Sequence, residues 1–356
     1  MLPFIHDAPA THVVFAPGSL AQVPAEVDRL GCTRVLLISG GPEGEFASLV
    51  AADLGHRLAG RWTEVVMHVP VEVSRRAVQH ARELDADLLI ALGGGSSTGM
   101  AKAIAKETGI PILAIPTTYA GSEMTQIWGQ TENSRKVTGR DIAVLPVSVI
   151  YDPMLTLTLP VELSAASGMN ALAHLVEGLY APGVSPVSAL IAGEGVRALA
   201  SALPRVVANP VDVEARGDAL YGAWLAGWTL GTTGMGIHHK ICHTLGGTHD
   251  LPHAGVHSAV LAYATDFNES AAAPAMAVIR ESFARAGRPA DTAAGAIWDL
   301  ATEIGAPTSI TSVGFDPQWI DETADIVSSA VVTNPREVTR EGVQALLSKA
   351  VDGARP

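Results

Sequence analysis

The stretch ADLLIALGGGSSTGMAKAIAKET, residues 86–108, runs from an apolar strand pattern through three glycines into a helical pattern. Gly93, Gly94 and Gly95 bring bare backbone N–H groups and a helix N-terminus to one place, which is where a pyrophosphate binds. The spacing departs from the G-x-G-x-x-G fingerprint, because Thr98 stands at the last glycine position. A plain tight turn is the alternative that this motif leaves open.

A second polar turn, IPTTYAGSEMTQ at residues 115–126, follows the next apolar strand pattern. Its threonines and backbone amides fall at the carboxyl edge of the predicted sheet, where open α/β sheets bind ligands. An ordinary polar loop with a capping threonine is the alternative. Two such turns after consecutive strands favour an NAD-type dinucleotide site. The predicted cofactor-binding residues are Gly40, Gly93, Gly94, Gly95, Ser96, Thr98, Lys102, Thr117, Thr118 and Ser122.

The first half of the chain alternates short apolar runs with helical patterns. The runs are RVLLIS (34–39), TEVVMHV (63–69), ADLLIAL (86–92), PILAIP (111–116) and AVLPVSVIYD (143–152). Helical patterns such as SRRAVQHAREL (74–84) lie between them, and this rhythm is typical of βαβ units in a parallel sheet. We therefore expect an N-terminal Rossmann-like dinucleotide-binding α/β domain over residues 1–157.

The second half shows no further strand pattern. Long Ala- and Leu-rich segments follow, for example residues 162–180 and 212–231, with proline-containing breaks at 182–186, 204–210 and 306–308. These segments predict helices, so residues 158–356 form an all-α catalytic domain in our prediction.

Composition excludes several classes of protein. Charged residues make up 17% of the 356 residues and aromatic residues 5%, as in a compact enzyme rather than a disordered chain. A formal charge of −13 opposes nucleic-acid or anionic membrane partners. The N-terminus has no signal-peptide pattern, no apolar run is long enough to span a membrane, and Cys32 and Cys242 suggest no disulfide framework. We expect a soluble, cytoplasmic protein.

Five histidines occur in GIHHKICHTLGGTHDLPH, residues 236–253. His239 and His243 share one helical face, and Asn170 and His174 form a second pair with the same spacing. Two such pairs and His253 resemble a divalent metal site, but Asn170 offers a neutral amide, which is a poor ligand for a transition metal. A three-histidine zinc or iron site and purely structural histidines both remain open at this point.

The chain resembles the iron-containing alcohol dehydrogenase superfamily and, within it, the maleylacetate reductases. The resemblance extends over the whole chain and is carried by ALGGGSSTGMAKAIA, PTTYAGSEMTQIWGQTE, KVTGRD, VIYDPMLTLTLP, SGMNALAHLVEGLYAP and HHKICHTLGGTHDLPHAGVHSAVLAY. It implies the dehydroquinate synthase-like fold of iron-type alcohol dehydrogenases, with the two domains described above, and a homodimer. In the metal-dependent members the ligands fall at the positions of Asn170, His174, His239 and His253, the first as aspartate. Asparagine at 170 therefore implies an enzyme without a metal.

The resemblance implies reduction of the C=C bond of maleylacetate to 3-oxoadipate by NADH or NADPH, an oxidoreductase step in aromatic-compound degradation. Gly40 stands where NAD-selective relatives often have an acidic residue, so we expect both cofactors to be used. The predicted catalytic residues are His243 as proton donor, with His174, His239 and His253 polarising the ketone. The predicted residues for binding the dicarboxylate are Asn170, Lys240, Arg140 and Tyr119.

Three other functions compete with this interpretation. The first is a metal-dependent (iron or zinc) alcohol or aldehyde dehydrogenase of the same superfamily, against which Asn170 argues. A metal-assisted hydrolase would need a carboxylate general base near HHKICH and would not need the glycine turn. A non-enzymatic binding module is the third, and failure to bind any nicotinamide cofactor would favour it.

Overall fold

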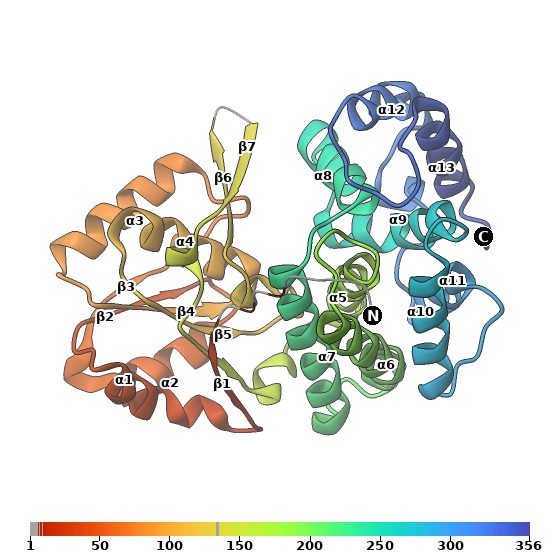
Figure 1. Ribbon diagram of the computed structural model, residues 1–356. Helices are drawn as coiled ribbons and strands as arrows, with labels where there is room; N and C mark the ends of the chain where they lie inside the picture. Colours follow the sequence, from red (N-terminus) through yellow and green to blue (C-terminus); the bar gives the residue numbers. More distant parts are fainter. Residues whose placement is uncertain (1–5, 7, 9, 133–134) are drawn as a thin grey trace. The chain divides into compact units, whose positions relative to one another are not determined.

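The computed structural model describes residues 6, 8, 10–132 and 135–356, and Figure 1 shows the arrangement of its elements. The chain divides into two compact units. The first is Ala8–Leu159, and the second is Pro160–Pro356 with the N-terminal segment that contains His6. The change of unit after Leu159 lies close to the predicted domain boundary. His6 is held in the second unit by Ser185, whose Oγ lies 3.1 Å from its Nδ1.

The first unit is built on a six-stranded parallel sheet in the order β1-β8-β5-β4-β2-β3. In chain order the strands are β1 His12–Phe15, β2 Val35–Ser39, β3 Leu58–Trp62, β4 Leu88–Gly93, β5 Ile112–Pro116 and β8 Ser148–Tyr151. Its helices are α1 Val23–Leu30, α2 Gly44–Leu54, α3 Val71–Glu83 and α4 Gly95–Thr108. Short 3-10 helices are η1 Ser19–Gln22, η2 Gly55–Arg57, η3 Ser122–Met124, η4 Ile142–Val144 and η5 Pro153–Thr156.

Helices cover both faces of this sheet, with α1 and α2 on one and α3 and α4 on the other (Figure 1). Every residue of β2, β4 and β5 is buried, which explains why these strands are continuous apolar runs rather than alternating ones. Val27 of α1 and Val50 of α2 pack in one core with Leu37 and Ile90 of the sheet. The predicted α/β class of this half is confirmed.

Two details of the first unit differ from the prediction. Residues 63–69, TEVVMHV, are not a strand; β3 is the preceding LAGRW, which pairs with β2. His68 and Val69 have φ of 61° and 48°, which extended backbone does not allow, and Met67 is 70% exposed. The antiparallel hairpin of β6 (Ile127–Glu132) and β7 (Arg135–Arg140) was not predicted.

The second unit is helical, and no strand follows Tyr151 in the described part of the chain. Its helices are α5 Val161–Gly178, α6 Pro186–Ala208, α7 Val213–Thr232, α8 Ile237–His249, α9 His253–Asn268, α10 Ala273–Arg285, α11 Ala293–Glu303, α12 Ile320–Ser328 and α13 Arg340–Asp352, with η6 Thr311–Val313 and η7 Pro317–Trp319. One core joins α8 and α9 to α12 and α13. Within the described residues, no helix is both long and apolar enough to cross a membrane.

One predicted break in this unit is wrong in position. Pro204 lies inside α6, which continues to Ala208. A proline this close to a helix C-terminus removes one backbone hydrogen bond but does not stop the helix. Cys32, which is half-buried, and Cys242, which is buried, are both free thiols.

Candidate dinucleotide site and histidine cluster

The glycine turn follows β4 at the carboxyl edge of the sheet and opens α4. Gly93 has φ +139°, and a Cβ there would lie 2.5 Å from the Ser97 Oγ, so only glycine fits. Gly94 is the N-cap of α4 and no side chain caps this end. The N–H groups of the first turn are therefore available to an anion, which the helix dipole also favours.

The threonine turn packs directly against the glycine turn. The Thr117 N–H donates to the Gly93 carbonyl at 3.2 Å. A Cβ at Gly94 would lie 3.0 Å from the Thr118 Cγ2 and 3.2 Å from its Oγ1. The structure thus brings together two turns that the sequence separates by about twenty residues, at the edge where nucleotides bind in such sheets.

Lys102 differs from its predicted role of reaching a phosphate. Its Nζ donates to the Ser122, Thr125 and Ile127 carbonyls at 2.6, 2.7 and 2.8 Å, and lies 3.0 Å from the Thr125 Oγ1. Lys102 is 1% exposed, and burial lowers its pKa to about 7, opposed by the charge of Glu123. With three N–H donors and four acceptors, the ammonium holds the segment after the threonine turn and has no donor left for a ligand.

The other predicted cofactor residues occupy different environments. Ser96 and Thr118 are half-buried, whereas Thr98 is 1% exposed on the inner face of α4. Gly40, after β2, borders the carboxylate of Glu43: a Cβ at this glycine would lie 3.2 Å from Glu43 Oε2. Ser122 starts η3, and its carbonyl is the one that accepts from Lys102.

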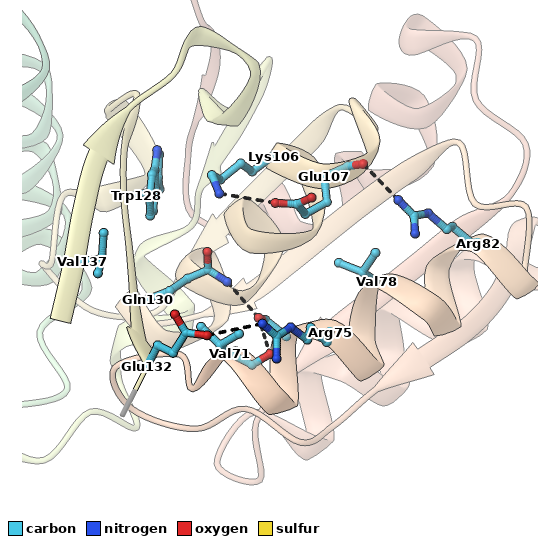
Figure 2. A pocket seen from close by; sticks show the side chains of 11 residues that line it. Val71, Arg75, Val78, Arg82, Lys106, Glu107, Trp128, Gln130, Glu132 and Val137 are labelled. Carbon is cyan, nitrogen blue, oxygen red and sulfur yellow. Dashed lines mark hydrogen bonds and ion pairs between the residues drawn. The ribbon is translucent and has the colours of Figure 1, made fainter. Parts of the chain in front are cut away.

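A groove of about 560 Å³ lies on the first unit, lined by α3, α4 and β6 with Val137 of β7 (Figure 2). None of the predicted cofactor residues lines it. Four of its charged side chains form ion pairs, Arg75 with Glu132 and Lys106 with Glu107, each at 3.3 Å, and Arg82 donates to the Glu107 carbonyl at 3.2 Å. Because each of these cationic side chains already has a partner in the protein, we assign the groove no ligand.

Helices α5, α8 and α9 of the second unit bring six imidazoles together. The rings of His174 and His239 stack with centroids 5.1 Å apart. His257 lies at the centre, with ring centroids 4.9 Å from His238, 4.9 Å from His239 and 4.3 Å from His253. The ring centroid of His243 lies 6.0 Å from that of His239. The predicted catalytic histidines therefore belong to one cluster.

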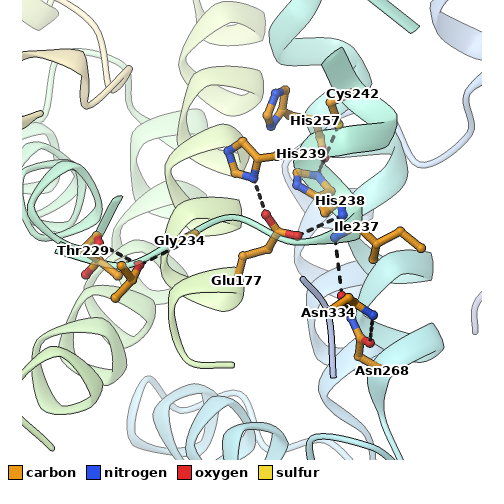
Figure 3. A network of polar contacts seen from close by, with 11 residues as sticks. Glu177, Thr229, Gly234, Ile237, His238, His239, Cys242, His257, Asn268 and Asn334 are labelled. Carbon is orange, nitrogen blue, oxygen red and sulfur yellow. Dashed lines mark hydrogen bonds and ion pairs between the residues drawn. The ribbon is translucent and has the colours of Figure 1, made fainter. Parts of the chain in front are cut away.

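Glu177, on α5, anchors the start of α8 (Figure 3). Its Oε1 accepts the His238 backbone N–H at 2.9 Å, and its Oε2 pairs with the His239 Nδ1. Since the carboxylate accepts, His239 carries its proton on Nδ1 and presents the Nε2 lone pair to the cluster. The His238 Nε2 donates to the His257 carbonyl at 2.9 Å, which makes His238 a structural histidine.

The buried histidines are neutral at neutral pH. Burial lowers the pKa of His238 to about 4, and burial together with the charge of His243 lowers the pKa of His239 to about 3. Burial also puts the pKa of His174 and His257 well below the ordinary value. Burial therefore favours the neutral forms of His174 and His239, and any part they take in polarising a ketone is that of neutral hydrogen-bonding groups.

Several buried polar atoms of this cluster have no protein hydrogen-bond partner among the described residues: Asn170 Oδ1, His174 Nδ1, His239 Nε2 and both ring nitrogens of His257. Buried polar groups are nearly always satisfied, so these atoms indicate a place where substrate or water binds. Asn170 is buried one helical turn before His174 on α5, and its place in a substrate site stays a prediction.

A metal ion fits this donor set poorly. Asn170, His174, His239 and His253 supply only neutral donors, and Glu177, the buried carboxylate beside them, has both oxygens in hydrogen bonds to α8. His238, His239 and His257 hold nitrogens within 4.8 Å of one another, but the Nε2 of His238 is committed to a carbonyl. At position 170, where the resemblance implies an aspartate in metal-dependent members, Asn170 adds no negative charge to balance a dication.

The remaining predicted residues are placed as follows. His243 and His253 are exposed, and Lys240 is half-buried on α8. Arg140, exposed at the end of β7, and Tyr119, fully buried in the threonine turn, belong to the first unit. Their role in binding substrate stays a prediction.

Three residues of the cluster were missed: Glu177, His238 and His257. A signal existed for two of them. Glu177 follows His174 by three positions, and His257 follows His253 by four, so each pair shares a helical face. His238 carries no such signal, because adjacent helical residues point in different directions.

Comparison with known proteins identifies the family. A model described as "Iron-containing alcohol dehydrogenase" matches residues 10–153, and one described as "Fe-containing alcohol dehydrogenase family, C-terminal" matches residues 164–351. The chain belongs to the iron-containing alcohol dehydrogenase family.

Individual relatives are similar over their full length. The maleylacetate reductase of Burkholderia cepacia is 47% identical over 356 residues, 100% of both chains. The crystal structure of maleylacetate reductase from Agrobacterium tumefaciens superposes with a TM-score of 0.96 at 43% identity, covering 100% of both chains. An iron-containing alcohol dehydrogenase from Corynebacterium glutamicum gives a TM-score of 0.94 at 46% identity, covering 99% of this chain and 98% of the other.

Proposed function

We propose that this protein reduces the carbon–carbon double bond of maleylacetate to give 3-oxoadipate, with NADH or NADPH as reductant and without a metal ion. The observation that carries the proposal is the 47% identity to a maleylacetate reductase over the whole of both chains. The glycine and threonine turns support a nicotinamide dinucleotide, and the neutral donor set around Asn170 supports chemistry without a metal.

The first-turn N–H groups of α4 bind the pyrophosphate in this proposal, with Thr118 packed over Gly94 to shape the turn. When bound, the nicotinamide supplies a hydride to the alkene carbon conjugated with the ketone. Negative charge then develops on the ketone oxygen as an enolate, and one proton completes the reduction at the adjacent carbon. One hydride and one proton thus convert the C=C bond into CH–CH.

Neutral hydrogen-bond donors stabilise the enolate in this proposal. The Asn170 amide and a neutral His174 carry N–H groups suited to the developing charge, whereas His239 has its proton on the Glu177 side. His243 is the proton donor in this proposal, because it is exposed on α8 and its ring lies beside the buried cluster, with a centroid 6.0 Å from that of His239. Lys240 attracts the substrate carboxylates.

The test is the initial rate of NADH oxidation with maleylacetate by purified protein in excess chelator, followed by the nicotinamide absorbance. The same assay is run in parallel with NADPH. We expect full turnover in the presence of chelator. No turnover in chelator, with activity restored by iron or zinc, would overturn the metal-free mechanism and favour a metal-dependent alcohol dehydrogenase. Failure with and without metal would overturn the substrate. The homodimer stays a prediction from the resemblance, and the cytoplasmic location stays a prediction from the sequence pattern.

A further inference from the structure

The start of α8 is held by side chains from other helices and loops. Its N-cap residue, Gly236, brings no side chain to the first turn, and the N–H groups of a first turn need acceptors. The Glu177 carboxylate is one such acceptor. Asn334 is the second, because its Oδ1 accepts the Ile237 N–H at 3.4 Å (Figure 3).

The amide of Asn334, in the segment between α12 and α13, uses all of its hydrogen-bonding capacity. Its Oδ1 also accepts from the Asn268 Nδ2 at 3.1 Å, and its Nδ2 donates to the Asn268 Oδ1 and to the Arg336 carbonyl, both at 2.7 Å. The Ile237 N–H can only donate and the Arg336 carbonyl can only accept, so the amide has a single orientation. Since Asn268 is the buried last residue of α9, Asn334 ties the end of α9 to the start of α8.

Gly236 makes this approach possible. A Cβ at Gly236 would lie 3.0 Å from the Asn334 Oδ1 and 3.0 Å from the Glu177 Oε1, so any other residue would push one of the two acceptors away. Gly234 and Gly236 also leave the connection from α7 without strong backbone preferences. The position of the first turn of α8 therefore depends on its side-chain anchors more than on the chain that leads into it.

The segment that carries Asn334 is itself fixed to α9. The Arg336 guanidinium lies over the Phe267 ring, 4.2 Å from the centroid, and its Nη1 donates to the Phe267 carbonyl at 3.2 Å. Two successive side chains of one helix end, Phe267 and Asn268, thus hold the segment in place. Asn334 can therefore transmit the position of α9 to α8.

The anchored turn carries the central ring of the histidine cluster. His239 follows Ile237 by two residues, and its ring centroid lies 5.1 Å from that of His174 on α5 and 4.9 Å from that of His257 on α9. A shift of the first turn of α8 changes these ring contacts directly. We propose that Asn334 is a positioning residue of the reaction, which holds α8 so that its histidines meet those of α5 and α9. The proposal rests on the proposed function in taking this cluster as the reaction site.

The experiment compares the wild-type protein with Asn334→Ala in steady-state kinetics and in hydrogen–deuterium exchange read by mass spectrometry. We expect kcat for maleylacetate reduction to fall about tenfold, while the Kd of NADH stays within about twofold, because the turns proposed to bind the dinucleotide belong to the first unit. Exchange over residues 236–241 should become about fivefold faster or more, and that of α10 and α11 should not change. The matched control is Asn209→Ala, the same substitution at an exposed position after α6, which should behave as the wild-type protein in both measurements.

A second variant keeps the test independent of the folding of the first. Asn334→Asp retains an acceptor for the Ile237 N–H but sets its other oxygen against the Asn268 Oδ1 and the Arg336 carbonyl. We expect it, too, to lower kcat and to speed exchange over residues 236–241.

Faster exchange with wild-type kcat in both variants would make Asn334 a merely structural residue and overturn the proposal. A lower kcat with unchanged exchange over residues 236–241, or faster exchange throughout the second unit, would overturn it as well. A wild-type protein that does not reduce maleylacetate would instead overturn the proposed function. In that case locally faster exchange still supports Asn334 as the anchor of α8, and unchanged exchange overturns it.

Discussion

The substitution Glu177→Gln tests whether the buried carboxylate orders the histidine cluster. Glu177 is 1% exposed and accepts from two donors, the His238 backbone N–H at 2.9 Å and the His239 Nδ1–H. A glutamine keeps one oxygen acceptor but turns an NH₂ group toward the other donor. One buried donor is then left unsatisfied, which costs about 1–3 kcal/mol in the free energy of unfolding.

His239 can respond in only one way that recovers the bond. Moving its proton from Nδ1 to Nε2 lets Nδ1 accept from the new amide, but the nitrogen that faces the cluster then presents a proton instead of a lone pair. We therefore expect Glu177→Gln to lower kcat for maleylacetate reduction about tenfold, because a reoriented or re-protonated His239 disturbs the rings of His174 and His243, whose centroids lie 5.1 and 6.0 Å from its own. The affinity for NADH should not change.

The assay combines urea unfolding with steady-state kinetics, and Glu162→Gln is the control. Glu162 lies in the first turn of the same helix, α5, and is exposed, so its replacement should cost less than about 1 kcal/mol. A Glu177→Gln protein with wild-type stability and wild-type kcat would refute the argument, because it would mean that neither donor depends on the carboxylate.

Two further predictions concern buried basic groups. Lys102→Met should lower the free energy of unfolding, measured in urea, by about 3–5 kcal/mol, because it leaves the carbonyls of Ser122, Thr125 and Ile127 without their donor. The control Lys106→Met should lower it by about 1 kcal/mol or less. Equal losses in the two variants would contradict the role assigned to Lys102. His238 is neutral when folded, with a pKa lowered to about 4, but takes up a proton below about pH 6.5 when unfolded. Its contribution to stability is therefore complete above that pH and is lost as the pH falls toward 4, by about 1.4 kcal/mol per pH unit. The melting temperature of His238→Gln should depend less on pH over this window than that of the wild-type protein, and parallel curves would argue against a buried neutral imidazole.

The local sequence was enough for elements whose pattern is strong on its own. The strand ending in Gly93–Gly95 and the helix after it were predictable, because an apolar run, a set of residues that tolerate positive φ and a 3.6-residue period coincide there. The pairs Asn170/His174 and His239/His243 were placed on helix faces for the same reason. The strand predicted at TEVVMHV, residues 63–69, was wrong, because a short apolar run does not show whether a neighbouring strand is available to pair with it.

The tertiary structure decides which groups from distant parts of the chain lie in contact. Lys102 has the sequence position of a phosphate ligand, but the packing of the segment after the threonine turn surrounds its ammonium with four oxygens. Asn334 lies ninety-seven positions beyond Ile237, yet it accepts the Ile237 N–H at the start of α8. The protonation of His239 depends on Glu177, sixty-two positions away. Hydrogen bonding and desolvation act over a few ångströms of space, so no spacing along the chain could have predicted these roles.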